Sequence, residues 1–373
     1  MKTQKFRFKT WLCGLFMSCF MGQGMIAQTT VAPTGTWVKP TNPQIQYVGR
    51  VSFTNPEAPC FTYPGVQIRA AFEGTSLRMV AKPNSGYFMV QIDEAKPFKV
   101  AFNSPKDSIV SLAAALPNGT HTVCVMNVLE AYERRPEFKG FLLDEGCKLV
   151  TPPALPTRKI EFIGNSITCG YGVEALDGKI HFSEDTENHY YTYAAIAARA
   201  LNAQHYVTAR SGIGIYRNYN GPKEGNPNCM PALYLQTLFG DSTEVWDCQR
   251  YQPDLVCVNL GTNDCSTKGY DPVRLKAAYV RFGQRLRTLY PAAKIVWLSG
   301  CMLNGEPMKL VERTLDEVTA EANVAGDKEV YRFSFSPQNG DLGYGADFHP
   351  SIGQQQRMAD ELIPFLRQLM GWN

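Results

Sequence analysis

The sequence predicts an α/β protein in two parts, an N-terminal β-sandwich of jelly-roll type and a domain built on a parallel sheet between two layers of helices. Short strand-like runs separated by glycine and proline turns fill the first part, up to about residue 150. Three prolines in residues 151–156 then interrupt the chain. From residue 157 onwards, apolar strand-like runs alternate with segments of helical periodicity, which is typical of a parallel sheet covered on both faces.

The chain begins with the features of a secretory signal peptide, predicted over residues 1–27. Four basic residues among the first nine precede an apolar stretch from Trp11 to about Ile26, and Ala27 offers a small residue for cleavage. Glycine, serine and glutamine interrupt this stretch, which disfavours a permanent membrane span. We therefore expect a secreted or periplasmic protein, with a lipoprotein anchored at Cys19 as the alternative. No later segment is apolar enough to span a bilayer.

Residues 36–150 are predicted to form the β-sandwich, because short alternating or apolar runs follow one another with turn residues between them. The Pro-Asn-Gly-Thr sequence of residues 117–120 predicts a hairpin turn ahead of the last run. The clearest runs lie at residues 66–70, 76–80, 87–92 and 121–125.

Residues 151–156 are predicted to be a linker, because proline lacks the N–H donor that a helix or a central strand requires. The second domain is placed at residues 157–373. Its strands are predicted at residues 159–163, 204–209, 255–260, 294–298 and 330–335. Its helices are predicted at about residues 188–202, 272–289, 307–324 and 352–369.

The composition argues against some classes of protein. The net charge of +3 is small and charges of both signs are spread along the chain, so no nucleic-acid surface is expected. Of eleven cysteines, Cys13 and Cys19 fall in the predicted signal peptide. The other nine include no Cys-x-x-Cys pair, and their odd number leaves at least one free thiol. Most are expected to be small buried residues, as at Cys257 and Cys301.

Three polar residues stand next to predicted strands or helices of the second domain. Ser166 follows its first strand, Asn263 follows its third strand, and His349 stands just before the last helix. In open parallel sheets, ligands bind outside the carboxyl ends of the strands. These side chains are therefore predicted to share one catalytic pocket, as in a serine esterase.

Ser166 is the predicted nucleophile and His349 is the predicted base. A serine hydroxyl is a poor nucleophile until a base takes its proton. Pro350 suits a turn or a first helical position. Ser351 and Gln354 form a capping pattern, which places His349 on a fixed loop at the entry of a helix.

An oxyanion formed during acyl transfer needs hydrogen-bond donors. Gly212 follows the second strand and lets its backbone N–H approach a substrate closely, and Gly214 is a close competitor. Asn263 offers a side-chain NH₂ group. The backbone N–H groups near Ser166, at the start of the element after the first strand, are further donors.

These segments resemble the four sequence blocks of the SGNH (GDSL-type) hydrolase superfamily. The matching segments are residues 164–166, Gly212, residues 261–264 and residues 347–350. The resemblance implies a three-layer α/β/α fold, with a serine nucleophile at Ser166 and a base at His349. It also implies an oxyanion hole made by the N–H groups of Ser166 and Gly212 and the side chain of Asn263.

A narrower resemblance covers nearly all of the mature chain. The chain is similar to carbohydrate esterase family 2 in three features: the sandwich ahead of the hydrolase domain, residues 138–146 and residues 211–218. This resemblance implies deacetylation of plant polysaccharides such as xylan and glucomannan. An acetylated polysaccharide or oligosaccharide is therefore the expected partner, and no cofactor is expected.

Two positions depart from the superfamily's pattern. Asn165 stands where many members have an aspartate, and this is not one of the four catalytic positions. The third member of the triad usually stands three residues before the histidine, where this chain has Ala346. Asp347, two residues before, is the candidate acceptor for the imidazole N–H that faces away from Ser166. The alternative acceptor is a backbone carbonyl, which would make the site a Ser-His dyad.

The remaining histidines have no metal-ligand spacing, so no catalytic metal is predicted. Two other functions stay open beside the polysaccharide esterase. The same blocks could serve a lysophospholipase or another lipid esterase. The chain could also be a carbohydrate-binding protein whose sandwich carries the function, although the set of Ser166, Gly212, Asn263 and His349 argues against a purely binding role.

Overall fold

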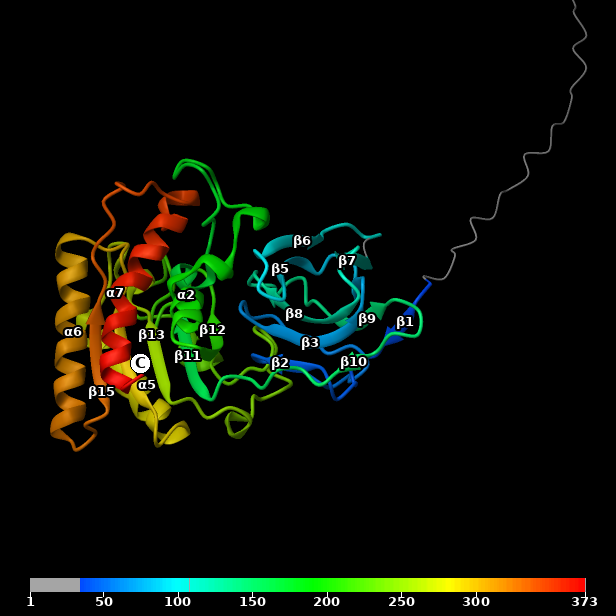
Figure 1. Cartoon of the computed structure of the whole chain (residues 1–373). Helices are drawn as coiled ribbons and strands as arrows, with labels where there is room; N and C mark the ends of the chain where they lie inside the picture. Colours follow the sequence, from blue (N-terminus) through cyan, green and yellow to red (C-terminus); the bar gives the residue numbers. More distant parts are fainter. Residues whose placement is uncertain (1–33, 107, 373) are drawn as a thin grey trace, which may run out of the picture. The chain divides into compact units, whose positions relative to one another are not determined.

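The computed structural model describes residues 34–106 and 108–372 (Figure 1). The predicted signal peptide at residues 1–27 and the alternative anchor at Cys19 lie outside the described residues. The chain from Gly35 onwards forms one compact unit. Among the described helices, none combines the length and the apolar character that crossing a bilayer requires.

Two antiparallel sheets build the first part of this unit, with strand orders β1-β9-β4-β7 and β10-β3-β8-β5-β6, and β2 pairs with β3. Alternate residues of β4 are buried, at Leu77, Met79 and Ala81, as the two-residue period of a strand requires. Both sheets contribute buried side chains to one apolar core, which confirms the predicted sandwich. The strands are β1 (Thr36–Val38), β2 (Gln46–Val48), β3 (Gln67–Gly74), β4 (Leu77–Ala81), β5 (Gly86–Ile92), β6 (Phe98–Phe102), β7 (Ile109–Ala113), β8 (Gly119–Asn127), β9 (Phe138–Leu143) and β10 (Leu149–Val150).

The predicted hairpin turn at residues 117–120 is wrong. The strand before it, β7, pairs with β4, whereas the strand after it, β8, pairs with β3 and β5 in the other sheet. The segment between them therefore crosses from one sheet to the other. Turn residues indicate that the chain changes direction, but the burial of both apolar faces decides which strand pairs with which.

A five-stranded parallel sheet with the order β12-β11-β13-β14-β15 builds the second part. The register aligns Gly164 at the end of β11 with Ala209 on one side and Asn259 on the other. Three strands thus end at the same level, and the loops that follow them meet at one edge. The strands are β11 (Arg158–Gly164), β12 (Ala203–Ala209), β13 (Leu255–Asn259), β14 (Lys294–Ser299) and β15 (Val330–Ser334), which confirms all five predicted strands.

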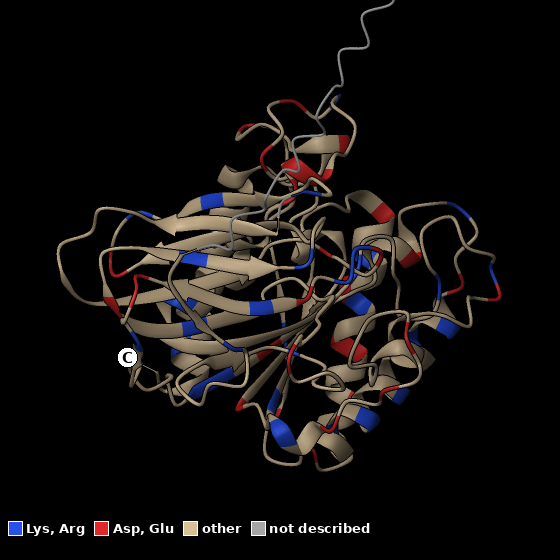
Figure 2. Cartoon of the chain, turned by 90° about the vertical axis from the view of Figure 1, so that its right-hand side faces the viewer, with Lys and Arg blue, Asp and Glu red and all other residues tan. Residues whose placement is uncertain are grey.

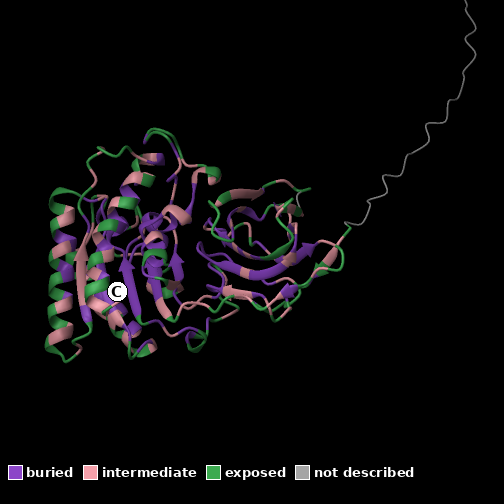
Figure 3. Cartoon of the chain, in the orientation of Figure 1, coloured by how far each residue is buried: buried purple, intermediate pink, exposed green. Residues whose placement is uncertain are grey.

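Helices cover both faces of this sheet, and alternate strand residues pack against opposite helix layers. Val256 and Val258 of β13 join the core under α5 and α6, whereas Leu255 and Cys257 join the core under α2 and α7. Figure 3 shows the central strands β11 and β13 as largely buried, the edge strand β15 as mostly intermediate and the outward side of α6 as exposed. The helices are α1 (Ser166–Cys169), α2 (Tyr193–Ala200), α3 (Met230–Leu233), α4 (Thr262–Cys265), α5 (Pro272–Leu289), α6 (Gly305–Val324) and α7 (Ile352–Met370).

One helix is shorter than predicted. The α2 helix begins at Tyr193 rather than near residue 188, because Thr192 caps it by accepting a hydrogen bond from the Ala195 amide. The residues before it form a separate 3₁₀ turn at His189–Tyr191. The helical periodicity of the sequence continues through this turn and does not indicate that the helix is interrupted there.

A buried ion pair joins the two parts of the unit. Arg50, on the loop after β2, donates to Glu161 in β11 at 3.0 Å, and both side chains are buried. Tyr234 and Thr208 also hydrogen-bond Glu161. Removing one partner of a buried pair costs about 3–5 kcal/mol because the other charge is left unpaired. The sandwich and the parallel sheet are therefore expected to unfold together.

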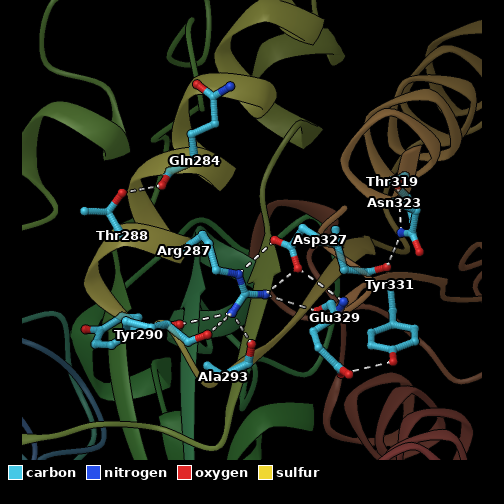
Figure 4. A network of polar contacts seen from close by, with 12 residues as sticks. Gln284, Arg287, Thr288, Tyr290, Ala293, Thr319, Asn323, Asp327, Glu329 and Tyr331 are labelled. Atoms are coloured by element: carbon cyan, nitrogen blue, oxygen red, sulfur yellow. Dashed lines mark hydrogen bonds and ion pairs between the residues drawn. The ribbon is translucent and has the colours of Figure 1, made fainter. Parts of the chain in front are cut away.

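A network around Arg287 fixes the opposite edge of the parallel sheet (Figure 4). Arg287, in the last turn of α5, pairs with Asp327 at 2.8 Å and donates to the carbonyl of Ala293 at 2.6 Å. Ala293 and Glu329 immediately precede β14 and β15. The network thus holds the amino ends of two strands and leaves the carboxyl ends for the site.

Charges of both signs occur throughout the described elements, and the thiols follow the expectation from composition. Lysine, arginine and acidic residues are interspersed over the elements in Figure 2. All nine cysteines in the described residues are free, and six of them are buried, including Cys257 and Cys301. These thiols pack as small apolar side chains, as predicted.

Candidate active site

Ser166 lies at the start of α1, directly after β11 and the turn at Gly164 and Asn165. The Asn165 side chain caps α1 by accepting a hydrogen bond from the Ile167 amide at 3.0 Å. Position 164 has no room for a side chain, because a Cβ there would lie 2.1 Å from the Thr168 hydroxyl. Small and polar residues therefore bring Ser166 to the carboxyl edge of the sheet, with its amide at a helix start where no intrahelical partner exists.

His349 meets Ser166 across 183 residues of sequence, with 2.9 Å between imidazole Nε2 and Ser166 Oγ. The other ring nitrogen, Nδ1, lies 3.1 Å from the carbonyl oxygen of Ala346. The predicted cap is present: Ser351 accepts a hydrogen bond from the Gln354 amide at 3.2 Å and starts α7. The structure thus brings the two principal predicted residues into direct contact.

Asp347 does not contact the imidazole of His349 through its carboxylate, which corrects the expectation that it orients the ring directly. One carboxylate oxygen lies 2.8 Å from the exposed His181 ring. The other accepts hydrogen bonds from the Tyr171 hydroxyl at 2.9 Å and the Phe182 amide at 3.0 Å. The alternative stated from the sequence, a backbone carbonyl on the imidazole, matches the geometry.

The reason lies in the backbone before His349. Asp347 has φ 49° and Phe348 has φ 60°, so two consecutive non-glycine residues are left-handed. This turn points the Ala346 carbonyl at His349 and the Asp347 side chain away from it. Aspartate tolerates the left-handed region better than most residues, and its three hydrogen bonds hold the turn.

Tyr171 is a site residue that the sequence reasoning missed. Its ring packs on the imidazole of His349 with 4.2 Å between centroids, and Phe182 stacks on its other side at 4.2 Å. The Tyr171 hydroxyl reaches Asp347, so the carboxylate holds the ring that holds the base. No short motif marks Tyr171, because its partners come from distant parts of the chain.

Four influences act on the protonation of His349. Burial lowers its pKa below the ordinary value, while the backbone carbonyls of Ala346 and Asp347 and the Asp347 charge oppose this by raising the pKa. Because the net shift is downward, the imidazole is neutral at pH 7 and is able to accept the Ser166 proton.

The predicted oxyanion donors lie beside Ser166. Gly212 and Asn263 line the same pocket as Ser166 and His349. Asn263 donates one N–H to the Ile213 carbonyl at 2.8 Å, which leaves its second amide hydrogen for a ligand. The competing candidate, Gly214, gives its amide to the Asn218 side chain at 3.0 Å. The hydrogen bonding therefore favours Gly212 over Gly214.

Asp264 braces the loop that follows Gly212. Its buried carboxylate accepts hydrogen bonds from the amides of Ile215, Tyr216 and Arg217 at 2.9–3.1 Å. Burial raises the pKa of Asp264, and these backbone hydrogen bonds oppose the rise. Asp264 thus holds the loop after β12, and this contact links the second and third strand ends.

The pocket over these residues has a volume of about 520 Å³. Its walls combine hydroxyl, amide and imidazole groups with the aliphatic side chains of Met302 and Leu303. Tyr219 is more than half exposed and stands at the pocket wall. Such a space accommodates a small acyl group next to a larger polar alcohol.

The site has a serine hydrogen-bonded to a histidine at the carboxyl edge of a parallel sheet, next to a glycine turn and an asparagine amide. This combination defines a serine hydrolase of the SGNH, or GDSL, class. Residues 162–352 match the GDSL-like lipase/acylhydrolase family, and residues 47–153 match the carbohydrate esterase 2 N-terminal family. The chain belongs to carbohydrate esterase family 2.

Individual relatives agree with this assignment. The chain is 37% identical over 331 residues to the cellulase/esterase CelE of Acetivibrio thermocellus, covering 89% of this chain but 40% of that protein. It is 30% identical to an acetylxylan esterase/glucomannan deacetylase of Cellvibrio japonicus, covering 95% of this chain and 97% of that protein. The chain thus spans less than half of CelE and nearly all of the Cellvibrio relative.

Solved structures give the same result. A family two carbohydrate esterase from Clostridium thermocellum in complex with cellohexaose has a TM-score of 0.82 and 37% identity, covering 88% of this chain and 100% of that chain. A family two carbohydrate esterase from Cellvibrio japonicus has a TM-score of 0.82 and 29% identity, covering 91% of this chain and 99% of that chain. The sandwich and the parallel sheet occur together in these relatives.

Replacing Asp347 with asparagine is expected to keep kcat within about 5-fold of the wild type, because asparagine can retain the hydrogen bonds from Tyr171 and Phe182. The Asp347 charge raises the pKa of His349, so its loss lowers that pKa further. Since the base works when neutral, the acid limb of kcat/KM moves to lower pH. Rate profiles between about pH 4 and 8 measure this shift.

The matched variant is Asp347→Ala, which also removes the hydrogen bonds. We expect kcat to fall by about 10- to 100-fold, because Tyr171 and the left-handed turn lose their support. A direct charge relay would instead make the asparagine variant as defective as the alanine variant. Equal losses in the two variants would contradict the positioning role.

Proposed function

We propose that the protein is an exported serine esterase that removes O-acetyl groups from plant polysaccharides such as acetylated xylan or glucomannan. The observation that carries the proposal is the hydrogen bond between Ser166 Oγ and His349 Nε2, in a pocket that also contains Gly212 and Asn263. Membership of carbohydrate esterase family 2 supports the reaction type. The acetylxylan esterase/glucomannan deacetylase relative supports the substrate class.

In this proposal Ser166 attacks the acetyl carbonyl while His349 takes its proton. The oxyanion is stabilised by the N–H groups of Ser166 and Gly212 and by the side chain of Asn263. His349 then protonates the departing sugar oxygen, leaving an acetyl group on Ser166. Water hydrolyses this acetyl-enzyme with His349 as the base, which releases acetate and restores the hydroxyl. The Ala346 carbonyl keeps the imidazole in the required orientation as a Ser-His dyad.

An ester is the favoured substrate bond because an alkoxide leaves more easily than an amide nitrogen. The exposed ring of Tyr219 offers a face on which a sugar could stack at the pocket wall. We place a signal peptide at residues 1–27, the sandwich at residues 36–150 and the hydrolase domain at residues 157–373. Export to the medium or periplasm follows from the signal peptide, and anchoring at Cys19 is the alternative.

The test is acetate release from acetylated xylan and acetylated glucomannan, with the wild type and Ser166→Ala compared side by side. We expect release by the wild type and none above background by the variant. The relative rates rank the two polysaccharides. A long-chain acyl ester and a lysophospholipid are measured in parallel with the same preparations.

Each alternative predicts a different pattern. Hydrolysis of the long-chain esters without acetate release would replace the proposal with a lipid esterase. If the protein hydrolysed none of these esters but bound the unmodified polysaccharide, a carbohydrate-binding role would replace the proposed esterase function. Equal acetate release by the wild type and Ser166→Ala would refute the serine mechanism.

A further inference from the structure

We propose that Glu130, on the segment joining β8 to β9 of the sandwich, is a positioning residue for the oxyanion turn at Ser211 and Gly212. The inference rests on the proposed function, because the turn stabilises an oxyanion only if acyl transfer occurs. It gives the N-terminal part of the chain a role in the chemistry of the second part. Glu130 belongs to none of the motifs that the sequence marks.

The contact between Glu130 and the turn is direct. Glu130 Oε2 accepts a hydrogen bond from the Ser211 amide at 2.7 Å, across 81 residues of sequence. The neighbouring groups of the turn are held too: the Arg210 amide donates to Gly164, and the Gly212 carbonyl accepts from the Tyr219 amide. Among the described residues, the Gly212 amide donates to no protein group. The turn is therefore fixed around the donor that faces the pocket.

Gly212 requires this kind of support. It has φ +75°, and a Cβ at this position would have no neighbour within 4 Å. The space on its Cβ side is therefore open, and glycine has the widest backbone freedom of any residue. Hydrogen bonds to its flanking peptide groups restrict the direction of its N–H. A donor that is already oriented stabilises a developing oxyanion without reorganisation during the reaction.

The segment that carries Glu130 is itself fixed. Its own amide donates to the Glu187 carboxylate at 3.2 Å, and the next amide, of Ala131, donates to the Thr62 carbonyl at 2.8 Å. On the other side, the Val128 carbonyl accepts from the His189 amide at 3.0 Å. Because the backbone on both sides of Glu130 is held in this way, its carboxylate has a fixed position from which it can hold the turn.

Of the neighbouring carboxyl groups of Glu130 and Glu187, Glu130 keeps its charge more easily, although burial raises the pKa of both. One carboxylate oxygen each of Glu130 and Glu187 and the Sγ atom of Cys169 lie within 4.8 Å of one another. Burial raises the pKa of Glu130, whereas the Ser211 hydrogen bonds and the Arg210 charge oppose the rise. Burial and the Glu130 charge raise the pKa of Glu187 further. A proton shared by the two carboxyl groups therefore rests on Glu187, and an ionised Glu130 makes the stronger hydrogen bond.

The experiment compares Glu130→Ala, Glu130→Gln and Lys99→Met in the full chain. Lys99 donates to the carbonyls of Asp185 and Glu187 and ties the sandwich to the same neighbourhood without touching Ser211. It is the matched control for a loss of contact between the two parts. The readouts are kcat and KM for acetate release per folded enzyme, the affinity of a boronic acid that forms a tetrahedral serine adduct, and hydrogen exchange at Ser211.

We expect Glu130→Ala to lower kcat by about 10- to 100-fold with KM within about 2-fold, and to lower boronate affinity by a similar factor. Exchange at the Ser211 amide should become at least about 10-fold faster. Glu130→Gln keeps an acceptor and should recover most of each loss. Lys99→Met should lower the melting temperature while leaving kcat per folded enzyme unchanged.

Two results would overturn the inference. One is a Glu130→Ala variant that is less stable but keeps its kcat per folded enzyme, as expected for Lys99→Met. The other is unchanged exchange at Ser211. If the wild type released no acetate, the proposed function would fail separately, and the exchange measurement would still decide whether Glu130 holds the turn.

Discussion

Replacing Ser166 with alanine is expected to lower kcat for acetate release by about 10⁴- to 10⁶-fold. The hydroxyl is the group that forms the acetyl-enzyme, and alanine offers no atom to take its place. Binding is expected to persist, because the pocket walls and the candidate donors Gly212 and Asn263 remain. Acetate release from acetylated xylan measures the loss, and binding of the same polysaccharide checks that the fold is intact.

The interaction of Ser166 with His349 makes this prediction sharper. If the 2.9 Å hydrogen bond is the proton-transfer contact, the two residues act as a unit. His349→Ala should then cost nearly as much as Ser166→Ala, and the double variant should be no worse than either. Independent contributions would multiply in the double variant. Multiplied losses, or a His349→Ala variant with more than about a tenth of the wild-type rate, would contradict the dyad.

Replacing Asn263 with alanine is expected to lower kcat by about 10²- to 10³-fold while KM changes little. The second amide hydrogen of Asn263 is the donor left for an oxyanion, because the first is given to Ile213. An interaction made mainly in the transition state affects kcat rather than substrate binding. Steady-state rates on a soluble acetyl ester measure both constants.

Asn263→Ala also removes the contact to Ile213, so a loss of structure has to be separated from a loss of the donor. The affinity for a tetrahedral boronate adduct should fall with kcat, while the melting temperature shifts by only a few degrees. Asn263→Asp, which keeps the size but brings a negative charge to the oxyanion, should be at least as inactive. A fully active Asn263→Asp enzyme would exclude Asn263 as a donor.

Much of the fold could be predicted from the sequence because its signals are local. Apolar runs such as residues 255–260 have the length and composition of buried strands, and the structure has β13 at Leu255–Asn259. The capping pattern of Ser351 and Gln354 likewise marked the start of α7. The two errors differ in cause. The start of α2 is set locally by the cap at Thr192, whereas the false hairpin at residues 117–120 reflects strand pairing that only the packed sandwich decides.

By itself the sequence determined the order of the strands and helices along the chain and the positions of Ser166 and His349 beside them. Apolar periodicity and small-residue turns are properties of neighbouring residues, so they can be read directly from the chain. The structure confirmed that these two side chains meet, whereas their catalytic roles stay predictions.

Only the tertiary structure decided which groups surround that pair. The Ala346 carbonyl, rather than the Asp347 carboxylate, lies against His349 because two left-handed residues turn the backbone. Tyr171 and Glu130 contribute to the site although neither belongs to a catalytic motif. Many residues along the chain could supply a hydrogen-bond acceptor or an aromatic ring. Which of them reaches the site depends on which distant segments the packed core brings together.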